Sequence, residues 1–168
     1  MAKPIKPILV IASLAAVVGL DRAGVLSAAQ ADTVRGSAQI IDGDSIRVQG
    51  VEIRLHGIDA PEGRQLCQDA QGQDYRCGDV AREALKSMTR GLDVQCNRLD
   101  VDRYGRWVSE CRTDQAILNE LMVIQGHAVA YRRYSQAYVG AEEQARAQKR
   151  GIWAGRFEKP ERWRRNNR

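Results

Sequence analysis

The sequence predicts an α+β, mainly β domain: a five-stranded Greek-key barrel of the OB type with about three helices. Three observations support this fold class. Short apolar stretches alternate with polar residues, as half-buried strands do; two turn-like segments join such stretches into hairpins; and segments with helical spacing lie between and after the hairpins. The chain of 168 residues shows no internal repeat, so a single domain over residues 32–155 is expected.

The expected strands are one leading strand and two hairpins, covering residues 33–41, 45–48, 51–57, 92–99 and 106–111. Gln49 and Gly50 form the turn of the first hairpin, so paired residue numbers sum to about 99 and Ser45 faces Arg54. The second hairpin turns at residues 102–105. The inserted helices are expected at residues 80–90, 117–125 and 136–150, each followed by glycine.

The four cysteines have a spacing that fits no usual zinc module and includes no Cys-x-x-Cys pair. Pairing the second hairpin about its turn places Cys96 opposite Cys111, which predicts a cross-strand disulfide. Cys67 and Cys77 then remain to close a polar loop. Each disulfide is expected to stabilise the fold by about 2 to 4 kcal/mol, mainly through the unfolded state.

The amino terminus has the features of a secretory signal peptide over residues 1–31. Lys3 and Lys6 precede an apolar run from Ile8 to Leu20, and small residues flank Gln30. An uncleaved membrane anchor is the weaker alternative, because a spanning helix needs about 20 apolar residues. We therefore expect a secreted or periplasmic protein.

The charge distribution does not by itself establish a basic binding face on the domain. The net charge is +5, of which residues 1–31 carry +2 and the basic tail, residues 156–168, carries +4, leaving −1 for the remainder. A nucleic-acid partner therefore has to be argued from particular residues rather than from composition.

Acidic residues gather at the open end of the first hairpin: Asp42, Asp44, Asp59 and Glu62. Such a cluster is usually tolerated where a cation or solvent relieves the repulsion, and oxygen ligands favour a hard metal such as calcium. Arg54 and Arg106 lie near this group in the predicted fold. Guanidinium groups bind phosphate oxygens in a bidentate manner and stabilise the charge of a phosphoryl-transfer transition state.

Five motifs in this order resemble the staphylococcal nuclease (thermonuclease) family over residues 33–153. They are Ile41-Asp42-Gly43-Asp44-Ser45, Ile53-Arg54-Leu55, Ile58-Asp59-Ala60-Pro61-Glu62, Asp102-Arg103-Tyr104-Gly105-Arg106, and Asn119-Glu120-Leu121 with Gln125-Gly126. The resemblance implies an OB-fold, calcium-dependent nuclease that cleaves DNA and RNA to 3′-phosphate products. Two departures are an alanine at position 60, where the founding member has threonine, and a cysteine-containing segment, residues 63–78, in place of a basic loop.

The resemblance also implies roles for individual residues. One calcium ion would bind Asp44, Asp59 and the backbone carbonyl of Ala60. Glu62 would activate or position the attacking water, and Arg54 and Arg106 would hold the scissile phosphate. The substrate-contacting residues would be Arg103, Tyr104 and Tyr131.

Two function classes remain open from the sequence. The first is an exported, metal-dependent endonuclease, expected to act as a monomer with single-stranded DNA or RNA favoured. The second is a catalytically silent OB-fold module that binds nucleic acid or another polyanion. Retention of the acidic residues and of both arginines favours the enzyme.

Overall fold

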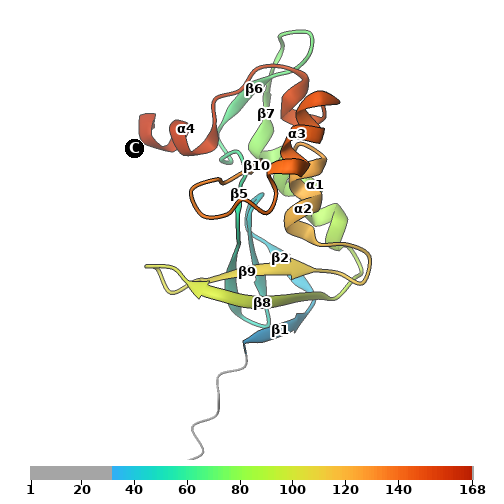
Figure 1. Cartoon of the computed structure of the whole chain (residues 1–168), viewed down its shortest axis with the longest axis vertical. Coiled ribbons are helices and arrows are strands. Elements are labelled where there is room, and N and C mark those ends of the chain that lie inside the picture. Colours follow the sequence, from blue (N-terminus) through green and yellow to red (C-terminus); the bar gives the residue numbers. More distant parts are fainter. Residues whose placement is uncertain (1–31, 168) are drawn as a thin grey trace, which may run out of the picture.

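The computed structural model describes residues 32–167, and the predicted signal peptide lies outside this range. A sheet of six strands forms the barrel: β1 (Thr33–Gly36), β2 (Ala38–Ile40), β3 (Ser45–Val48), β4 (Val51–Leu55), β8 (Val94–Val101) and β9 (Trp107–Arg112). Their spatial order is β1-β8-β9-β4-β3-β2. Figure 1 shows β8, β9, β1 and β2 at one end of the molecule, with α1, α2 and α3 toward the other.

The predicted leading strand is bent into β1 and β2, with Ser37 between them. β1 pairs with β8 and β2 pairs with β3, so the two halves of one strand lie at opposite ends of the strand order. The bend therefore brings the sheet almost to closure. Counting β1 and β2 as one strand gives the predicted five-stranded barrel and confirms the fold class.

Both predicted hairpin registers are confirmed. Ser45 pairs with Arg54 in the first hairpin, and Cys96 pairs with Cys111 in the second. The second hairpin differs in one detail, because a register shift between Arg98 and Asp100 introduces an irregularity near the turn. β4 also pairs with β9 in parallel, which places the two hairpins side by side in the barrel wall.

Both predicted disulfides are present, Cys67–Cys77 and Cys96–Cys111. The first links β6 (Leu66–Gln68) to Cys77, which directly follows β7 (Asp74–Arg76). β6 and β7 form a small hairpin that the sequence did not predict. A second unpredicted pair joins β5 (Ile58–Asp59) to β10 (Val129–Ala130). These strands have only two or three residues each, too few for a periodic pattern to reveal.

The three predicted helices are present with different ends: α1 (Cys77–Thr89), α2 (Leu118–Ile124) and α3 (Val139–Ala147). α1 begins three residues earlier than expected, and α3 is shorter at both ends. Two elements follow that the sequence did not predict, a 3₁₀ turn (Gly151–Ala154) and α4 (Pro160–Asn166). In Figure 1, α4 lies apart from α1–α3, on the other side of the β5–β10 pair.

The main hydrophobic core lies between the barrel and helices α1 and α2, and includes the fully buried Ile46, Ile53, Leu85 and Met122. A smaller cluster around Cys67, Cys77 and Ile152 packs under the C-terminal segment. No helix within residues 32–167 is long and apolar enough to cross a membrane.

Candidate functional site

Arg54 is the centre of the candidate site. It lies on β4, and its Nη2 donates to Asp44 Oδ2 and to Asp59 Oδ1, each at 3.1 Å. Asp44 and Asp59 are 4% and 1% exposed, so this is a buried charge cluster rather than a surface ion pair. Burial would lower the pKa of Arg54, but the charges of Asp44 and Asp59 outweigh it and raise that pKa.

Asp44 is held by the turn that precedes β3. Its backbone N–H donates to Asp42 Oδ1 at 3.0 Å, and its own Oδ2 accepts from the backbone N–H of Ala60 at 3.1 Å. Gly43 makes this approach possible, because a Cβ there would lie 2.7 Å from the Cβ of Ala60 and 2.8 Å from the Cβ of Ala81. The Asp-Gly-Asp turn and the Ala60 segment are therefore packed directly against each other.

Asp59 belongs to β5, which the pairing of Val129 with Asp59 fixes against β10. Burial, and then the charge of Asp44, raise the pKa of Asp59 to about 6, although Arg54 acts in the opposite direction. Burial and the same Asp44 charge also raise the pKa of Asp42 to about 6. Burial is the larger cause for both groups, and repulsion between neighbouring carboxylates adds to it.

Glu62 is placed by backbone contacts of the loop that follows β5. Its N–H donates to Gln65 Oε1 at 3.2 Å, and a Cβ at Gly78 would lie only 2.0 Å from its carbonyl oxygen. α1 therefore packs its first turn against the loop. The Glu62 carboxylate is 35% exposed and accepts from Arg164 Nη1 at 2.7 Å.

The β8–β9 turn holds a second group of predicted residues. Arg106 donates from Nε to Asp102 Oδ2 at 2.9 Å and also lies over the ring of Tyr104. Arg103 lies over the same ring and donates to the Tyr104 hydroxyl at 2.7 Å. Burial would raise the pKa of Asp102, but hydrogen bonds from Arg106 and from the N–H of Tyr104 hold it below its usual value.

These turn residues are not joined to the buried cluster. Among residues 32–167, neither Arg106 nor Arg103 forms an ion pair with Asp44, Asp59 or Glu62, and the Tyr104 side chain is largely exposed. Tyr131 does lie near the cluster, since it follows β10, which pairs with β5, and its N–H donates to the carbonyl of Gly57 at 2.8 Å. Burial, and then the charges of Asp59 and Glu161, raise its pKa. It packs edge-on against Tyr134, with ring centroids 4.8 Å apart.

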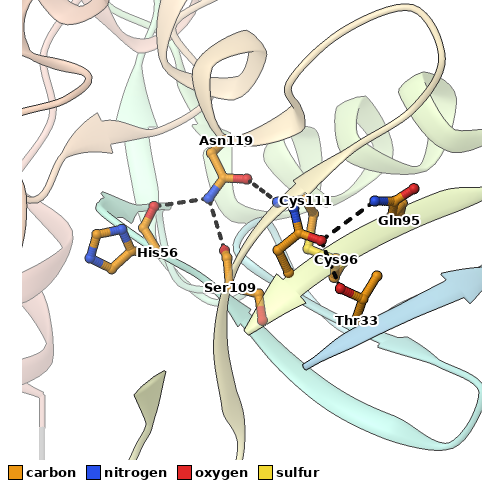
Figure 2. Close-up of a disulfide and its surroundings, with 8 residues drawn as sticks. Thr33, His56, Gln95, Cys96, Ser109, Cys111 and Asn119 are labelled. Atoms are coloured by element: carbon orange, nitrogen blue, oxygen red, sulfur yellow. Dashed lines mark hydrogen bonds between the residues drawn. A yellow bond between two sulfur atoms is a disulfide. The ribbon is translucent and has the colours of Figure 1, made fainter. Parts of the chain in front are cut away.

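Asn119, on α2, connects the strands that carry these groups. Figure 2 shows its amide between the end of β4, at His56, and strand β9, at Ser109 and Cys111. Nδ2 donates to the carbonyls of His56 at 2.9 Å and Ser109 at 3.1 Å, and Oδ1 accepts from the N–H of Cys111 at 2.9 Å. The fully buried side chain thus ties the end of β4 to β9.

The donor set of the buried cluster fits a hard cation. Asp44 and Asp59 are close enough to share one guanidinium nitrogen, and their oxygens are the ligands that calcium prefers. Across the described part of the chain, no three His, Cys, Asp or Glu side chains are gathered closely enough to hold a metal. A cation here would therefore draw on the two carboxylates, backbone carbonyls and water.

Sequence reasoning missed two residues at this site. Gln65, fully buried, connects the Glu62 loop to the C-terminal segment by donating to the carbonyl of Glu158 at 2.6 Å. Arg164, on α4, contacts both Asp59 and Glu62. A signal for α4 exists in the sequence: Pro160 at the helix start, Glu161 in the first turn and basic residues in the last.

Comparison with known proteins identifies similar chains. A family model described as staphylococcal nuclease homologue matches residues 52–155. A succinoglycan biosynthesis protein, ExoI, of Rhizobium meliloti (strain 1021) is 36% identical over 129 residues, covering 75% of this chain and 68% of the relative. A micrococcal nuclease of Shigella flexneri is 35% identical over 146 residues, covering 76% and 78%.

A probable staphylococcal-like nuclease, CAN1, of Oryza sativa subsp. japonica is 36% identical over 129 residues. That match covers 75% of this chain but only 36% of the rice protein. The match to the family model includes Arg54, Asp59, Glu62 and Arg106, whereas α4 lies beyond its end. The extent of these matches shows that the chain belongs to the staphylococcal nuclease family.

Proposed function

We propose that this protein is an exported, calcium-dependent endonuclease that hydrolyses phosphodiester bonds of DNA and RNA, with single strands favoured and 3′-phosphate products. The observation that carries the proposal is the half-buried Arg54 guanidinium held between the buried carboxylates of Asp44 and Asp59. This arrangement brings a phosphate-binding group and two cation ligands together in one place. Family membership and nuclease-named relatives support the same reaction class.

The proposed reaction uses Glu62 as the base. Its partly exposed carboxylate can accept a proton from a water molecule while the water oxygen attacks the phosphorus atom. The P–O5′ bond then breaks and its electron pair leaves with O5′, which takes a proton from solvent. The products carry a 3′-phosphate and a 5′-hydroxyl, and Glu62 returns its proton to solvent. Proton acceptance by a positioned carboxylate typically contributes a factor of about 10² to 10⁴ to the rate.

The arginines would stabilise the phosphate as negative charge develops on its oxygens. Arg54 is already confined by its two carboxylate partners, so it needs little reorganisation to reach a phosphate beside them. Arg106 would have to exchange its bonds with Asp102 for the phosphate. Arg103, Tyr104 and Tyr131 are proposed to contact the neighbouring nucleotides.

A calcium ion bound by Asp44, Asp59 and the carbonyl of Ala60 would supply Lewis-acid charge stabilisation. The two carboxylates lie beside the Ala60 backbone, as the hydrogen bond from its N–H to Asp44 shows. Calcium accepts 6–8 oxygen ligands in flexible geometry, so waters and substrate oxygens can complete the site.

The proposed export rests on the predicted signal peptide and on the two disulfides, which are typical of oxidising compartments. In such a compartment both bonds would persist.

The test is cleavage of single-stranded DNA by the purified protein, with calcium or with a chelator. We expect cleavage only with calcium, and its loss in Asp44→Ala and in Asp59→Ala because each removes a charged ligand. Asp114→Ala, which removes an exposed carboxylate from a turn near β9, is the matched control and should leave activity unchanged. A protein that binds DNA but never cuts it with any divalent cation would instead be a silent OB-fold binding module.

A further inference from the structure

The C-terminal segment is anchored next to the proposed site. Gln68 and Arg156 form an isolated β-bridge through two backbone hydrogen bonds of 2.7 and 3.1 Å. Pro160, at the start of α4, is buried, and the carbonyl of Glu158 accepts from the buried Gln65. The sequence analysis treated residues 156–168 as a basic tail, but the described part of this segment packs on the loop that carries Glu62.

This anchoring places Arg164 within the carboxylate cluster. Its Nη2 donates to Asp59 Oδ1 at 2.8 Å, and its Nη1 donates to Glu62 Oε1 at 2.7 Å. The side chain is 26% exposed, so both bonds are partly shielded from water. Burial would lower the pKa of Arg164, but its bonds to Glu62 and Asp59 raise it, so the guanidinium stays charged.

Arg54 and Arg164 converge on one oxygen atom, Asp59 Oδ1. A cation that binds Asp59 therefore has to compete with two guanidinium groups. Arg54 comes from the barrel and lies within the match to the family model, whereas Arg164 comes from a helix beyond that match. Arg164 is thus contributed to the site by the C-terminal segment, outside the residues that the family model matches.

We propose that Arg164 sets the metal affinity of the site by holding Asp59 and Glu62 in the metal-free protein. The inference rests on the proposed calcium site and goes beyond it. The guanidinium occupies Asp59 Oδ1, an oxygen that could bind calcium, and a positive charge this close opposes a divalent cation. Arg164 therefore lowers the calcium affinity of the site, so that a higher calcium concentration is needed to fill it.

The experiment is calorimetric titration of the metal-free protein with calcium chloride, comparing Arg164→Gln with the unaltered chain. Glutamine removes the charge and the bidentate grip, so we expect calcium to bind at least about tenfold more tightly. Arg165→Gln is the matched control, because it removes the same charge one residue later, from an exposed side chain that forms no ion pair within residues 32–167. It should change the calcium affinity by less than about twofold. The calcium concentration for half-maximal DNA cleavage should fall in parallel with the calorimetric constant.

Unchanged or weaker calcium binding by Arg164→Gln overturns the proposal, as does an equal gain in Arg165→Gln. Arg164→Lys protects the test against a folding defect, because lysine keeps the charge but cannot bridge two carboxylates as a planar guanidinium does. Arg164→Lys should therefore give a smaller gain in calcium affinity than Arg164→Gln. If Arg164→Gln does not fold, a folded Arg164→Lys with unchanged calcium affinity overturns the proposal. Absence of DNA cleavage by the unaltered protein would overturn the nuclease proposal, whereas calorimetry decides the role of Arg164.

Discussion

Replacing Asn119 with alanine tests how the scaffold holds the strands that carry the site. The substitution removes three hydrogen bonds, those with His56, Ser109 and Cys111. Ser109 O still accepts from the N–H of His56, but the N–H of Cys111 and the carbonyl of His56 lose their partner. Two buried groups left unpaired at about 1–3 kcal/mol each, with one further bond worth about 1 kcal/mol, predict a loss of about 3–7 kcal/mol.

The assay is equilibrium urea unfolding with the disulfides intact, followed by tryptophan fluorescence. With a denaturant slope of about 1–3 kcal/mol/M, the midpoint should fall by about 2–3 M without a change in slope. Asn97→Ala is the control, because Asn97 accepts an exposed hydrogen bond from Thr33 at 3.1 Å, and its loss should cost less than about 1 kcal/mol. Equal losses in the two variants would refute the reasoning.

Three further predictions concern the turn, the Glu62 loop and the central arginine. Asp102→Asn should destabilise the protein at neutral pH. Because the pKa of Asp102 is lowered in the folded state, the stability that its carboxylate contributes is lost as pH falls below about 4. Urea unfolding should therefore show the difference in unfolding free energy between variant and parent shrinking below that pH. Gly78→Ala should displace the loop and lower cleavage at saturating calcium, since a Cβ would meet the Glu62 carbonyl at 2.0 Å; full turnover would contradict this. Arg54→Lys should cut far more slowly while still binding DNA, because an ammonium keeps the charge but loses the bidentate geometry; unchanged turnover would argue against a phosphate contact.

The barrel and half of the site were predictable because they depend on local register. Gln49 and Gly50, both with positive φ, form a two-residue turn, and that turn alone fixes Ser45 opposite Arg54. Asp44 is adjacent to Ser45, so the Arg54–Asp44 contact follows from the hairpin. The same logic predicted the Cys96–Cys111 disulfide.

The rest of the site depends on contacts between distant segments. Arg164 is 102 residues from Glu62, and its position follows from a β-bridge and from Gln65, none of which has a periodic signature. The bend at Ser37, which divides the leading strand between two partners, has one weak local signal, the preceding Gly36, and a single glycine does not show that the two halves pair with different strands. The Arg106–Asp102 ion pair, in contrast, was predictable from the sequence. The two residues are four apart in one turn, a spacing that could have indicated that Asp102 holds Arg106.

The most direct test of the nuclease proposal is Glu62→Gln, assayed for both cleavage and binding of single-stranded DNA in calcium. Glutamine retains an oxygen that can accept from Arg164, so α4 should stay in place while the base is lost. We predict near-normal affinity and turnover lower by about 10² to 10⁴-fold, with Glu83→Gln, on the exposed face of α1, unchanged in both. Full calcium-dependent cleavage by Glu62→Gln would contradict the account.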